Sequence, residues 1–534
     1  MNLNLDRLQG YLAKNNIEAS LLSAHDQFFC ECPPCYDKRL QWLTGFSGSF
    51  AVVIVTAKQC YFFTDSRYIL QAKKELDPSC QIFDIAKTTP WGLANKLGLK
   101  VFYDPKLVTY DYLQKFSCCA LAAKINPVDA LWKRKNQKKT KIFDHPIKYC
   151  GKSSAEKRRE IASDLPYFFT NPESVCWLLN IRGNDIENTP IVLCRAILYP
   201  DAAVKLFIEN DNFELQAKTE RQIEILSKSK LEDCLKYENK IALDPKCTSK
   251  YYLDLIGDEK VEHRQDPCII HKACKNQTEI DGAINAHKKD AKALVKFFGW
   301  LKKNVGCTEV DAANAVLNFR KEQDLFYCQS FETISAFGKN GAIVHYHPTE
   351  GQNDVITKEN LYLIDSGGQY LDGTTDVTRT VCLGRPTKQQ IFHYTIVLKA
   401  HIAIATAVFS PGITGKQLDT LARIHLWKHG LDYGHGTGHG VGSFLNVHEG
   451  PQSFGNDIPI KQGMIMSNEP GIYIPDQYGI RLENLMYVKK NSNGFFYFEV
   501  LTLVPFQENL IDKNLLTKEE KSWLFWFSKK MHLS

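Results

Sequence analysis

The first 267 residues alternate between amphipathic helical stretches and short apolar runs. Residues 51–55 and 61–64 are apolar runs of strand length, and 191–194 is a similar run further along. Alternating helical and strand patterns are typical of α/β domains. We therefore expect an α/β fold on each side of the polar, basic stretch 133–141, which has no periodicity and predicts a solvated linker.

The two α/β stretches carry a faint internal repeat. Three residues recur at one common offset of 135 residues: Trp42, Leu43 and Gly48 match Trp177, Leu178 and Gly183. An apolar run follows each copy. The repeat predicts a pair of related, non-catalytic domains.

The pattern changes near residue 273. A long amphipathic helix is predicted over 278–303, and Thr308 opens another helix with a capping-box-like start. Apolar strands are expected at 361–364 and 378–382, with a polar turn between them.

The last part of the chain combines helices with strand-like runs. Helices are expected over 387–409 and 415–429, the second ended by Gly430 in the position of a C-cap glycine. Residues 431–505 are Gly-rich and strand-like, which predicts an α+β domain. The expected domain boundaries, to which the resemblance described below contributes, are 1–138, 139–270 and 271–534.

Composition excludes several classes of protein. The 534 residues are 44% hydrophobic and 24% charged, which rules out disorder along the whole chain. A formal net charge of +6 is too small to indicate nucleic acid as the main partner, and the basic stretch 133–141 lacks interleaved aromatic residues. No run approaches the ~20 apolar residues of a membrane helix, so we expect no membrane partner. Seventeen cysteines without an apolar leader at 1–16 predict reduced thiols and a cytoplasmic protein.

Candidate chemistry is concentrated in the last domain. Nine of the fifteen histidines lie between His345 and His448. Asp365, Asp376 and Glu483 lie in or beside strand-like runs, where solvated carboxylates are not expected. Burying an unpaired carboxylate is costly, so each should meet a cation.

The cation could be a side chain or a metal ion. Arg379 and Arg481 are the nearby basic residues, whereas a metal would satisfy several carboxylates at once. Each acid taken alone fits a surface or turn position. Together with His439 and Glu469, the acids predict a metal site.

The Gly-rich stretch 435–442 holds His435 and His439 among four glycines, which exclude a stable helix. It is therefore not the helical His-Glu-x-x-His zinc motif. Because residue 441 is Val441, it also departs from the dinucleotide pattern G-x-G-x-x-G. One histidine as a metal ligand and the other as a substrate contact is compatible with this geometry.

These residues resemble the pita-bread metallopeptidases, the group that includes methionine aminopeptidase, prolidase and creatinase. The five dimetal ligands of that group are matched by Asp365, Asp376, His439, Glu469 and Glu483, and its surrounding histidines by His345, His435 and His448. Within the group the chain is most similar to the three-domain Xaa-Pro aminopeptidases, on the segments 39–48, 64–68, 180–183 and 501–505. Ser66 stands where that family commonly has glycine, but Arg67 is kept.

The resemblance implies a fold and an activity. The fold would be α/β plus α+β, with two creatinase-like N-terminal α/β domains followed by a pita-bread catalytic domain. The activity would be hydrolysis of the bond between an N-terminal residue and a proline in second position. Two divalent cations would share a hydroxide nucleophile, and a donor set rich in carboxylates favours Mn²⁺.

The resemblance also implies roles for single residues. Asp365 would bind one ion, His439 and Glu469 the other, and Asp376 and Glu483 would bridge the two. Glu469 would be the general base.

Further roles concern the substrate and the support of the ligands. We expect His345, His435 and His448 to contact the substrate and assist catalysis, with His345 or His448 as a donor to the oxyanion. Arg67 would meet the C-terminal side of the substrate. Arg481 and Tyr473 would form hydrogen bonds that orient the ligands. Relatives often form homodimers, so we expect one here.

Two alternatives stay open. A prolidase-type dipeptidase would use the same metals on X-Pro dipeptides only, and the three-domain length disfavours it. A catalytically inactive pita-bread protein acting as a binding module usually lacks ligands, and here all five are present.

Overall fold

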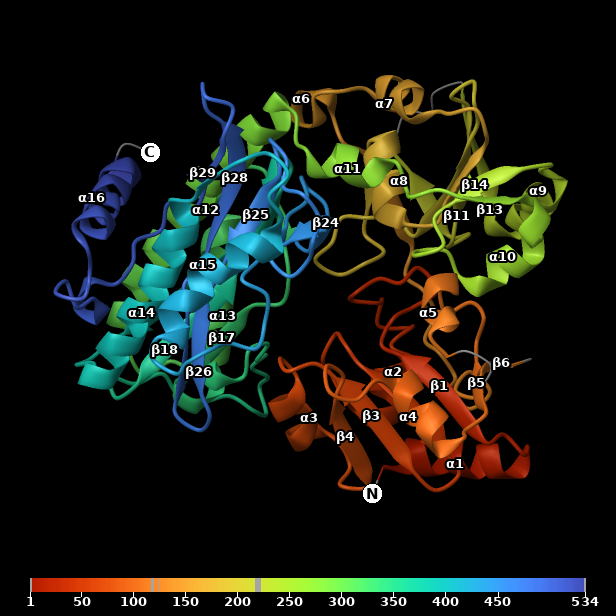
Figure 1. Cartoon of the computed structure of the whole chain (residues 1–534), viewed down its shortest axis with the longest axis horizontal. Coiled ribbons are helices and arrows are strands. Elements are labelled where there is room, and N and C mark those ends of the chain that lie inside the picture. The colour runs from red at the N-terminus through yellow and green to blue at the C-terminus, as the bar shows by residue number, and fades with distance from the viewer. Residues whose placement is uncertain (1, 117–119, 124, 217–221, 533–534) are drawn as a thin grey trace. The chain divides into compact units, whose positions relative to one another are not determined.

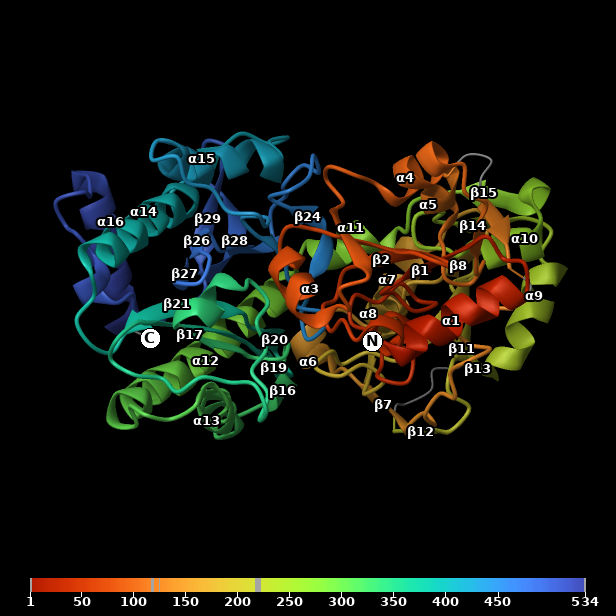
Figure 2. The ribbon, with the colours of Figure 1, turned by 90° about the horizontal axis from the view of Figure 1, so that it is seen from below.

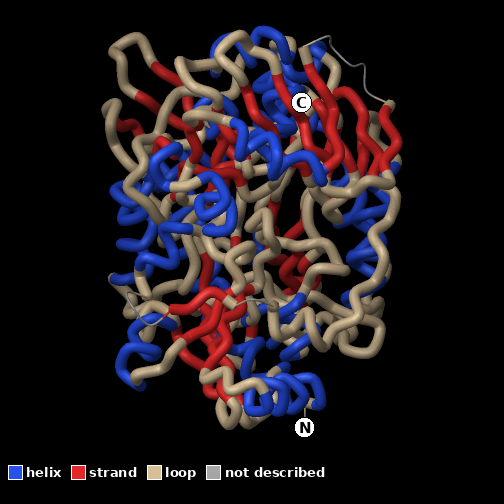
Figure 3. The backbone as a smooth tube through the Cα atoms, turned by 90° about the vertical axis from the view of Figure 1, so that its right-hand side faces the viewer, coloured by secondary structure: helices blue, strands red, loops and turns tan. Residues whose placement is uncertain are grey.

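The computed structural model describes residues 2–116, 120–123, 125–216 and 222–532. The chain divides into two compact units. The N-terminal unit contains Met1–Asp144, Lys152–Glu187 and Ile191–Cys268. The C-terminal unit contains His145–Gly151, Asn188–Pro190 and Ile269–Ser534. Each unit combines helices, strands and long loops (Figure 3).

The N-terminal unit contains two six-stranded sheets of equal topology (Figure 1). The first has the order β4 (Cys80–Asp84), β3 (Cys60–Thr64), β2 (Val52–Thr56), β1 (Ala19–Ser23), β5 (Val101–Tyr103) and β6 (Ala120–Ala122). The second has the order β13 (Ile223–Ser227), β11 (Val204–Ile208), β10 (Cys194–Leu198), β8 (Tyr167–Phe169), β14 (Ile241–Leu243) and β15 (Val261–His263). Parallel and antiparallel pairs occur at the same places in both sheets. The internal repeat predicted from the sequence is confirmed.

Helices accompany both sheets. They are α1 (Leu3–Lys14), α2 (Arg39–Thr44), α3 (Ile69–Glu75), α4 (Pro90–Leu97), α5 (Tyr110–Gln114), α7 (Ser154–Ile161), α8 (Pro172–Leu179), α9 (Leu231–Tyr237) and α10 (Lys250–Ile256). The repeated tryptophans lie on α2 and α8. Each of these helices ends in a left-handed residue, Gly45 with φ 81° and Asn180 with φ 51°, at the same offset as the tryptophans. Glycine and asparagine are the residues that adopt this conformation most readily.

Two expectations for the N-terminal half need correction. The strand expected at 191–194 begins only at Cys194, because side chains occupy the preceding amides: Val192 N–H bonds to Cys176 Sγ and Leu193 N–H to Asp185 Oδ2. The stretch 133–141 is irregular only as far as Lys139, because Thr140 begins the strand β7 (Thr140–Asp144), and it is not uniformly solvated, since the half-buried Arg134 bonds to Asp37 at 2.9 Å.

A three-stranded and a six-stranded sheet of the C-terminal unit position the predicted site residues, beside a second three-stranded sheet and a hairpin. One sheet has the order β17 (Ile334–Phe337), β18 (Leu361–Ser366) and β21 (Val377–Cys382). The other has the order β22 (Val408–Phe409), β29 (Phe496–Val500), β28 (Asn484–Lys490), β25 (Ile465–Asn468), β23 (His439–Gly440) and β24 (Glu449–Ser453). The hairpin of β26 (Gly471–Ile474) and β27 (Tyr478–Arg481) contacts both β18 and β21. These strands lie between the pair α12 (Gln277–Lys303) and α13 (Glu309–Lys321) and the pair α14 (Lys388–Ala405) and α15 (Gly415–Trp427) (Figure 2).

The predicted helix starts are confirmed, and one predicted helix is too long. Thr308 caps α13 with a reciprocal bond to Asp311, and Gly430 is left-handed with φ 69° just after α15. The helix expected over 387–409 ends at Ala405. Thr406 leaves the helical conformation, and the β-branched Val408 then pairs with β29 instead. None of the described helices has both the length and the hydropathy of a membrane span.

Candidate metal centre

Two of the five predicted ligands come from the three-stranded sheet β17–β18–β21 of the C-terminal unit. Asp365 lies near the end of β18, and Asp376 directly precedes β21. The two strands are antiparallel, with Asp365 opposite Thr378, so both carboxylates reach the same end of the sheet. Both residues are buried.

The other three ligands come from the six-stranded sheet. Glu469 follows the last residue of β25, and Glu483 precedes the first residue of β28. Because Asn468 pairs with Asn484 in the antiparallel ladder, the two glutamates are cross-strand neighbours. His439 begins β23, which pairs with β25.

A glycine allows His439 to approach β25. A Cβ atom on Gly438 would lie 2.0 Å from the carbonyl oxygen of Ser467. With no side chain there, Ser467 Oγ accepts the His439 backbone N–H at 2.9 Å and donates to Glu469 Oε1 at 3.1 Å. Ser467 therefore connects two predicted ligands.

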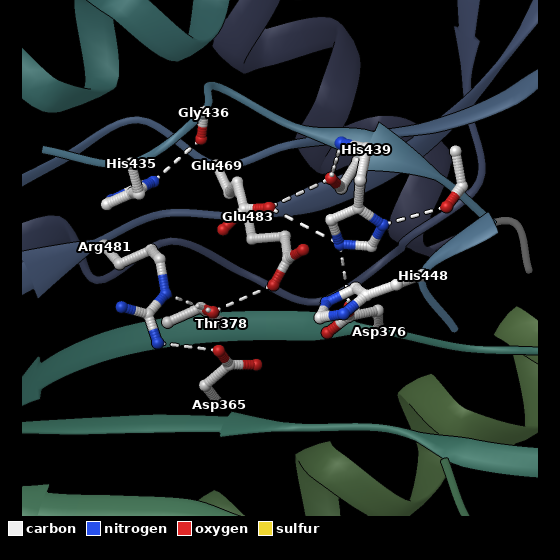
Figure 4. Close-up of polar contacts among 12 residues, drawn as sticks. Asp365, Asp376, Thr378, His435, Gly436, His439, His448, Glu469, Arg481 and Glu483 are labelled. Atoms are coloured by element: carbon white, nitrogen blue, oxygen red, sulfur yellow. Dashed lines mark hydrogen bonds and ion pairs between the residues drawn. The ribbon is translucent and has the colours of Figure 1, made fainter. Parts of the chain in front are cut away.

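The five side chains converge (Figure 4). His439 Nε2 lies 3.5 Å from Asp376 Oδ2 and 3.5 Å from Glu469 Oε1. One donor atom each of Asp376, His439 and Glu483 lies within 4.8 Å of the others. His439 Nδ1 lies 2.9 Å from the carbonyl oxygen of Gly440, which assigns the proton to Nδ1 and leaves Nε2 free to bind a metal.

Asp365 joins the group through Arg481. Arg481 Nη2 donates to Asp365 Oδ2 at 2.6 Å, and Nε donates to Thr378 Oγ1 at 3.2 Å. Thr378 in turn donates to Glu483 Oε2 at 2.8 Å. The guanidinium and the threonine hydroxyl thus fix carboxylates from both sheets.

Arg481 also orients two residues that were expected near the substrate and the ligands. Nη1 donates to Tyr473 Oη at 2.7 Å, and Tyr473 Oη lies 2.8 Å from His435 Nε2. His435 Nδ1 lies 2.7 Å from the carbonyl oxygen of Gly436. Tyr473 accepts from Arg481 and donates to His435, so the imidazole carries its proton on Nδ1. Burial raises the pKa of Tyr473 to about 12, which keeps the hydroxyl protonated.

The electrostatics of the cluster favour added positive charge. Burial, with contributions from Asp376 and Glu469, raises the pKa of Asp365 to about 7 although Arg481 opposes the shift. Burial and the neighbouring carboxylates raise the pKa of Glu483 well above its usual range. Arg481 pairs directly with one of the four carboxylates, Asp365.

Two oxygens in the cluster are available to a ligand. Asp365 Oδ1 and Asp376 Oδ1 are buried, and within the described part of the chain neither has a hydrogen-bond partner. Buried carboxylate oxygens without a donor are suited to bind a cation. The residues present fit a pair of divalent ions.

The remaining predicted residues lie at different places. The ring of His448 is 4.3 Å from the ring of His439, centroid to centroid, and almost perpendicular to it (Figure 4). His345 follows Val344, whose carbonyl oxygen accepts from Arg481 Nη2 at 3.3 Å. Arg67 belongs to the N-terminal unit and pairs with Asp65 at 2.7 Å.

One expected cation is not at the centre. Arg379 bonds to the carbonyl oxygens of Thr378, Glu483 and Val504 and to Asn484 Oδ1, not to a ligand carboxylate. As the next residue after Thr378 on a strand, its side chain points to the opposite face. Strand alternation could also have revealed Thr378, because it lies two residues after Asp376. No pattern in the sequence indicated the role of Ser467.

Models of known protein families match successive parts of the chain. Models of the Creatinase/Prolidase N-terminal domain match residues 4–132 and 133–279, the model of metallopeptidase family M24 matches 282–490, and the C-terminal region of that peptidase matches 494–531. A probable Xaa-Pro aminopeptidase P of Laccaria bicolor is 36% identical over 97% of this chain and 88% of its own length. The chain belongs to the Xaa-Pro aminopeptidase P family of M24 metallopeptidases. A further family member, from Sordaria macrospora, is 36% identical over 97% of this chain and 94% of its own length.

Solved structures agree with this family. An X-prolyl aminopeptidase from Caenorhabditis elegans, described as a cytosolic enzyme with a di-nuclear active site, has a TM-score of 0.91 at 32% identity, covering 99% of this chain and 95% of its own. The prolidase from Pyrococcus furiosus, 24% identical over 63% of this chain and 96% of its own with a TM-score of 0.50, shares the fold. The predicted architecture, two creatinase-like domains and a pita-bread metallopeptidase domain, is confirmed.

Proposed function

We propose that the chain removes the N-terminal residue from peptides whose second residue is proline, with two divalent cations as cofactors. The observation that carries this proposal is the convergence of four buried or half-buried carboxylates and the free Nε2 of His439 around Asp376. The di-nuclear active site of the C. elegans relative supports the number of ions.

The ligand positions suggest how the ions would be held. Asp365 would bind one ion and His439 with Glu469 the other, while Asp376 and Glu483 would lie between them. Carboxylates dominate this donor set, which favours a hard ion such as Mn²⁺. When bound, the two ions would supply an activated water as nucleophile and polarise the scissile carbonyl.

The protein side chains would handle protons and orientation. Glu469 has an exposed fraction of 16%, the largest among the four carboxylates, and is therefore accessible to accept a proton from the attacking water. His448 or His345 would donate a hydrogen bond to the developing oxyanion. His435, held by Tyr473, would contact the substrate on its proline side.

Proline at the second position would require a dedicated site. The X–Pro bond has no N–H, and the ring restricts the preceding residue, so general peptidases bind it poorly. Arg67 stays a predicted contact for the C-terminal side of the substrate. A substrate longer than a dipeptide would separate this function from that of a dipeptidase.

We further propose a cytoplasmic homodimer. The buried Cys60, Cys176 and Cys194 carry free thiols, as expected in a reducing compartment, and the C. elegans relative is described as cytosolic. Helix α15 exposes Leu421, Ile424 and Trp427 at a spacing of three residues, by 40%, 43% and 48%. A second copy of the chain would cover this apolar face.

Hydrolysis by chelated and metal-loaded protein tests the activity. We expect chelated protein to be inactive, and added Mn²⁺ to restore cleavage of an X-Pro-Z tripeptide with release of free X. Cleavage of X-Pro dipeptides alone would indicate the dipeptidase, and no cleavage of either by folded, metal-loaded protein would indicate the binding module.

A further inference from the structure

A buried carboxylate outside the metal centre has an unusual set of partners. Glu309 is the first residue of α13 and is fully buried. Its Oε1 accepts the backbone N–H of Phe337 at 2.5 Å and Nδ2 of Asn340 at 3.0 Å. Its Oε2 accepts Tyr346 Oη at 2.8 Å and the backbone N–H of Asp354 at 2.8 Å. Four donors saturate the carboxylate.

All four donors belong to the segment 337–354, which carries His345. Tyr346 directly follows His345, and its ring packs with Ile343 and Leu363 in one small apolar cluster. Asn340 also bonds to Asp354 Oδ2 at 3.1 Å and accepts, through its carbonyl oxygen, the N–H of Ile343 at 3.0 Å. Glu309 is thus the common acceptor for a folded loop around His345.

The other side of the same segment is fixed by the metal centre. The carbonyl oxygen of Val344 accepts from Arg481, the residue that also binds Asp365. The backbones of Gly341 and Gly479 approach so closely that a Cβ on Gly479 would lie 1.7 Å from the carbonyl oxygen of Gly341. His345 therefore lies on a short segment held between Glu309 and Arg481.

Stability alone is a weak reason for this arrangement. Burial raises the pKa of Glu309 although the four hydrogen bonds oppose the shift, and every donor described here is uncharged. Taking a carboxylate out of water without a cation is costly, and an apolar contact could hold two segments together as well. A rigid four-point acceptor instead fixes direction as well as distance.

We propose that Glu309 is a positioning residue for His345. Glu309 fixes the backbone of 343–346 so that the imidazole of His345 meets the scissile carbonyl. This inference rests on the proposed peptidase function. Glu309 itself would touch neither substrate nor metal, and it would act on turnover only through His345.

The variant Glu309→Gln preserves size and removes one acceptor. Whichever way the new amide turns, its NH₂ group faces a backbone N–H, either of Phe337 or of Asp354. A buried donor facing a donor is equivalent to a lost hydrogen bond, so we expect kcat on an X-Pro-Z tripeptide to fall about 10- to 100-fold. KM should change less than about threefold, because the contact matters most in the transition state.

A double-mutant cycle with His345→Ala separates positioning from a general structural effect. If Glu309 acts only through His345, adding Glu309→Gln to His345→Ala should lower kcat by less than about twofold. Additive losses in the double variant would overturn the proposal. Should Glu309→Gln fail to fold, Tyr346→Phe enters the same cycle, with an expected single loss of about three- to tenfold.

A matched control lies on the same helix end. Asp311→Asn removes a carboxylate that bonds only to Thr308 among the described contacts, so it should leave kcat unchanged. Equal losses of kcat for Asp311→Asn and Glu309→Gln would overturn the proposal, because they would indicate disturbance of α13 rather than of His345.

A second readout is independent of turnover. Backbone hydrogen exchange in metal-free protein should speed up over 337–346 in Glu309→Gln and stay unchanged around Asp376 and Glu483. Unchanged exchange over 337–346 would overturn the inference. Folded, metal-loaded wild-type protein without tripeptide cleavage would instead refute the proposed function, and this exchange result would still be interpretable.

Discussion

Arg481 Nη1 donates to Tyr473 Oη at 2.7 Å across the β26–β27 hairpin, and the same guanidinium holds Asp365 through Nη2. The tyrosine hydroxyl in turn forms a hydrogen bond with His435 Nε2 at 2.8 Å. A ligand carboxylate and the predicted substrate contact are therefore connected through two side chains.

Removing the hydroxyl tests this connection. We expect Tyr473→Phe to lower kcat/KM by about tenfold, because the hydrogen bonds of the hydroxyl to Arg481 and His435 are both lost, while two ions per chain are still bound. Steady-state kinetics and metal analysis of the same sample check this. A proportional loss of metal and activity would show that Tyr473 supports the ligands and not His435.

Glu469 should be required for the proton transfer. Glu469→Gln keeps an oxygen that can accept from Ser467 but cannot take a proton, so we expect kcat to fall by at least about 10²-fold with the fold intact. Glu499→Gln, at the surface contact of β29 with Lys530, serves as the control and should retain turnover. Near-normal kcat in Glu469→Gln would refute the role of Glu469 as base.

The N-terminal unit should show a pH dependence set by Asp26. Asp26 Oδ1 accepts the N–H groups of Phe28 and Cys30, and burial, aided by Asp37, raises the pKa of Asp26 to about 6. The folded pKa lies above the usual 3.8, so the stabilising contribution is fully present below pH 3.8 and is lost as the pH rises through 6.

The variant Asp26→Asn isolates this contribution. Between pH 4 and pH 7 the wild-type free energy of unfolding should fall by about 2–3 kcal/mol more than that of Asp26→Asn. Urea unfolding of both proteins at the two pH values measures the difference. Parallel pH dependence of the two proteins would contradict the prediction.

The proposed dimer depends on the exposed face of α15. Trp427→Glu introduces a charge there, and we expect it to convert a dimer into a monomer in sedimentation experiments at micromolar concentration. Val295→Glu, at a 54% exposed position of α12, is the matched control and should stay dimeric. A monomeric wild-type protein would refute the proposed homodimer.

The sequence allowed much of the fold and most of the candidate centre to be predicted. Asp365 and Asp376 are noticeable because carboxylates beside apolar strands need a partner. The repeat of Trp42 in Trp177 predicted two related domains, and these contain two sheets of the same topology. Helix starts were predictable because capping residues such as Thr308 act locally.

What could not be predicted depends on contacts distant in sequence. Ser467 connects His439 to Glu469 only because Gly438 lets β23 approach β25. Glu309 faces the His345 loop through four hydrogen bonds that no local pattern indicates. Arg379 was expected beside the acids, but strand alternation turns it toward buried carbonyl groups.

The central claim is that five side chains hold two cations, and anomalous diffraction tests it most directly. Crystals of chelated protein reloaded with Mn²⁺ should give two anomalous peaks per chain, each about 2.0–2.4 Å from oxygens or nitrogen of the group, consisting of Asp365, Asp376, His439, Glu469 and Glu483. Peaks elsewhere, or none among these five side chains in crystals soaked at saturating Mn²⁺, would contradict the account.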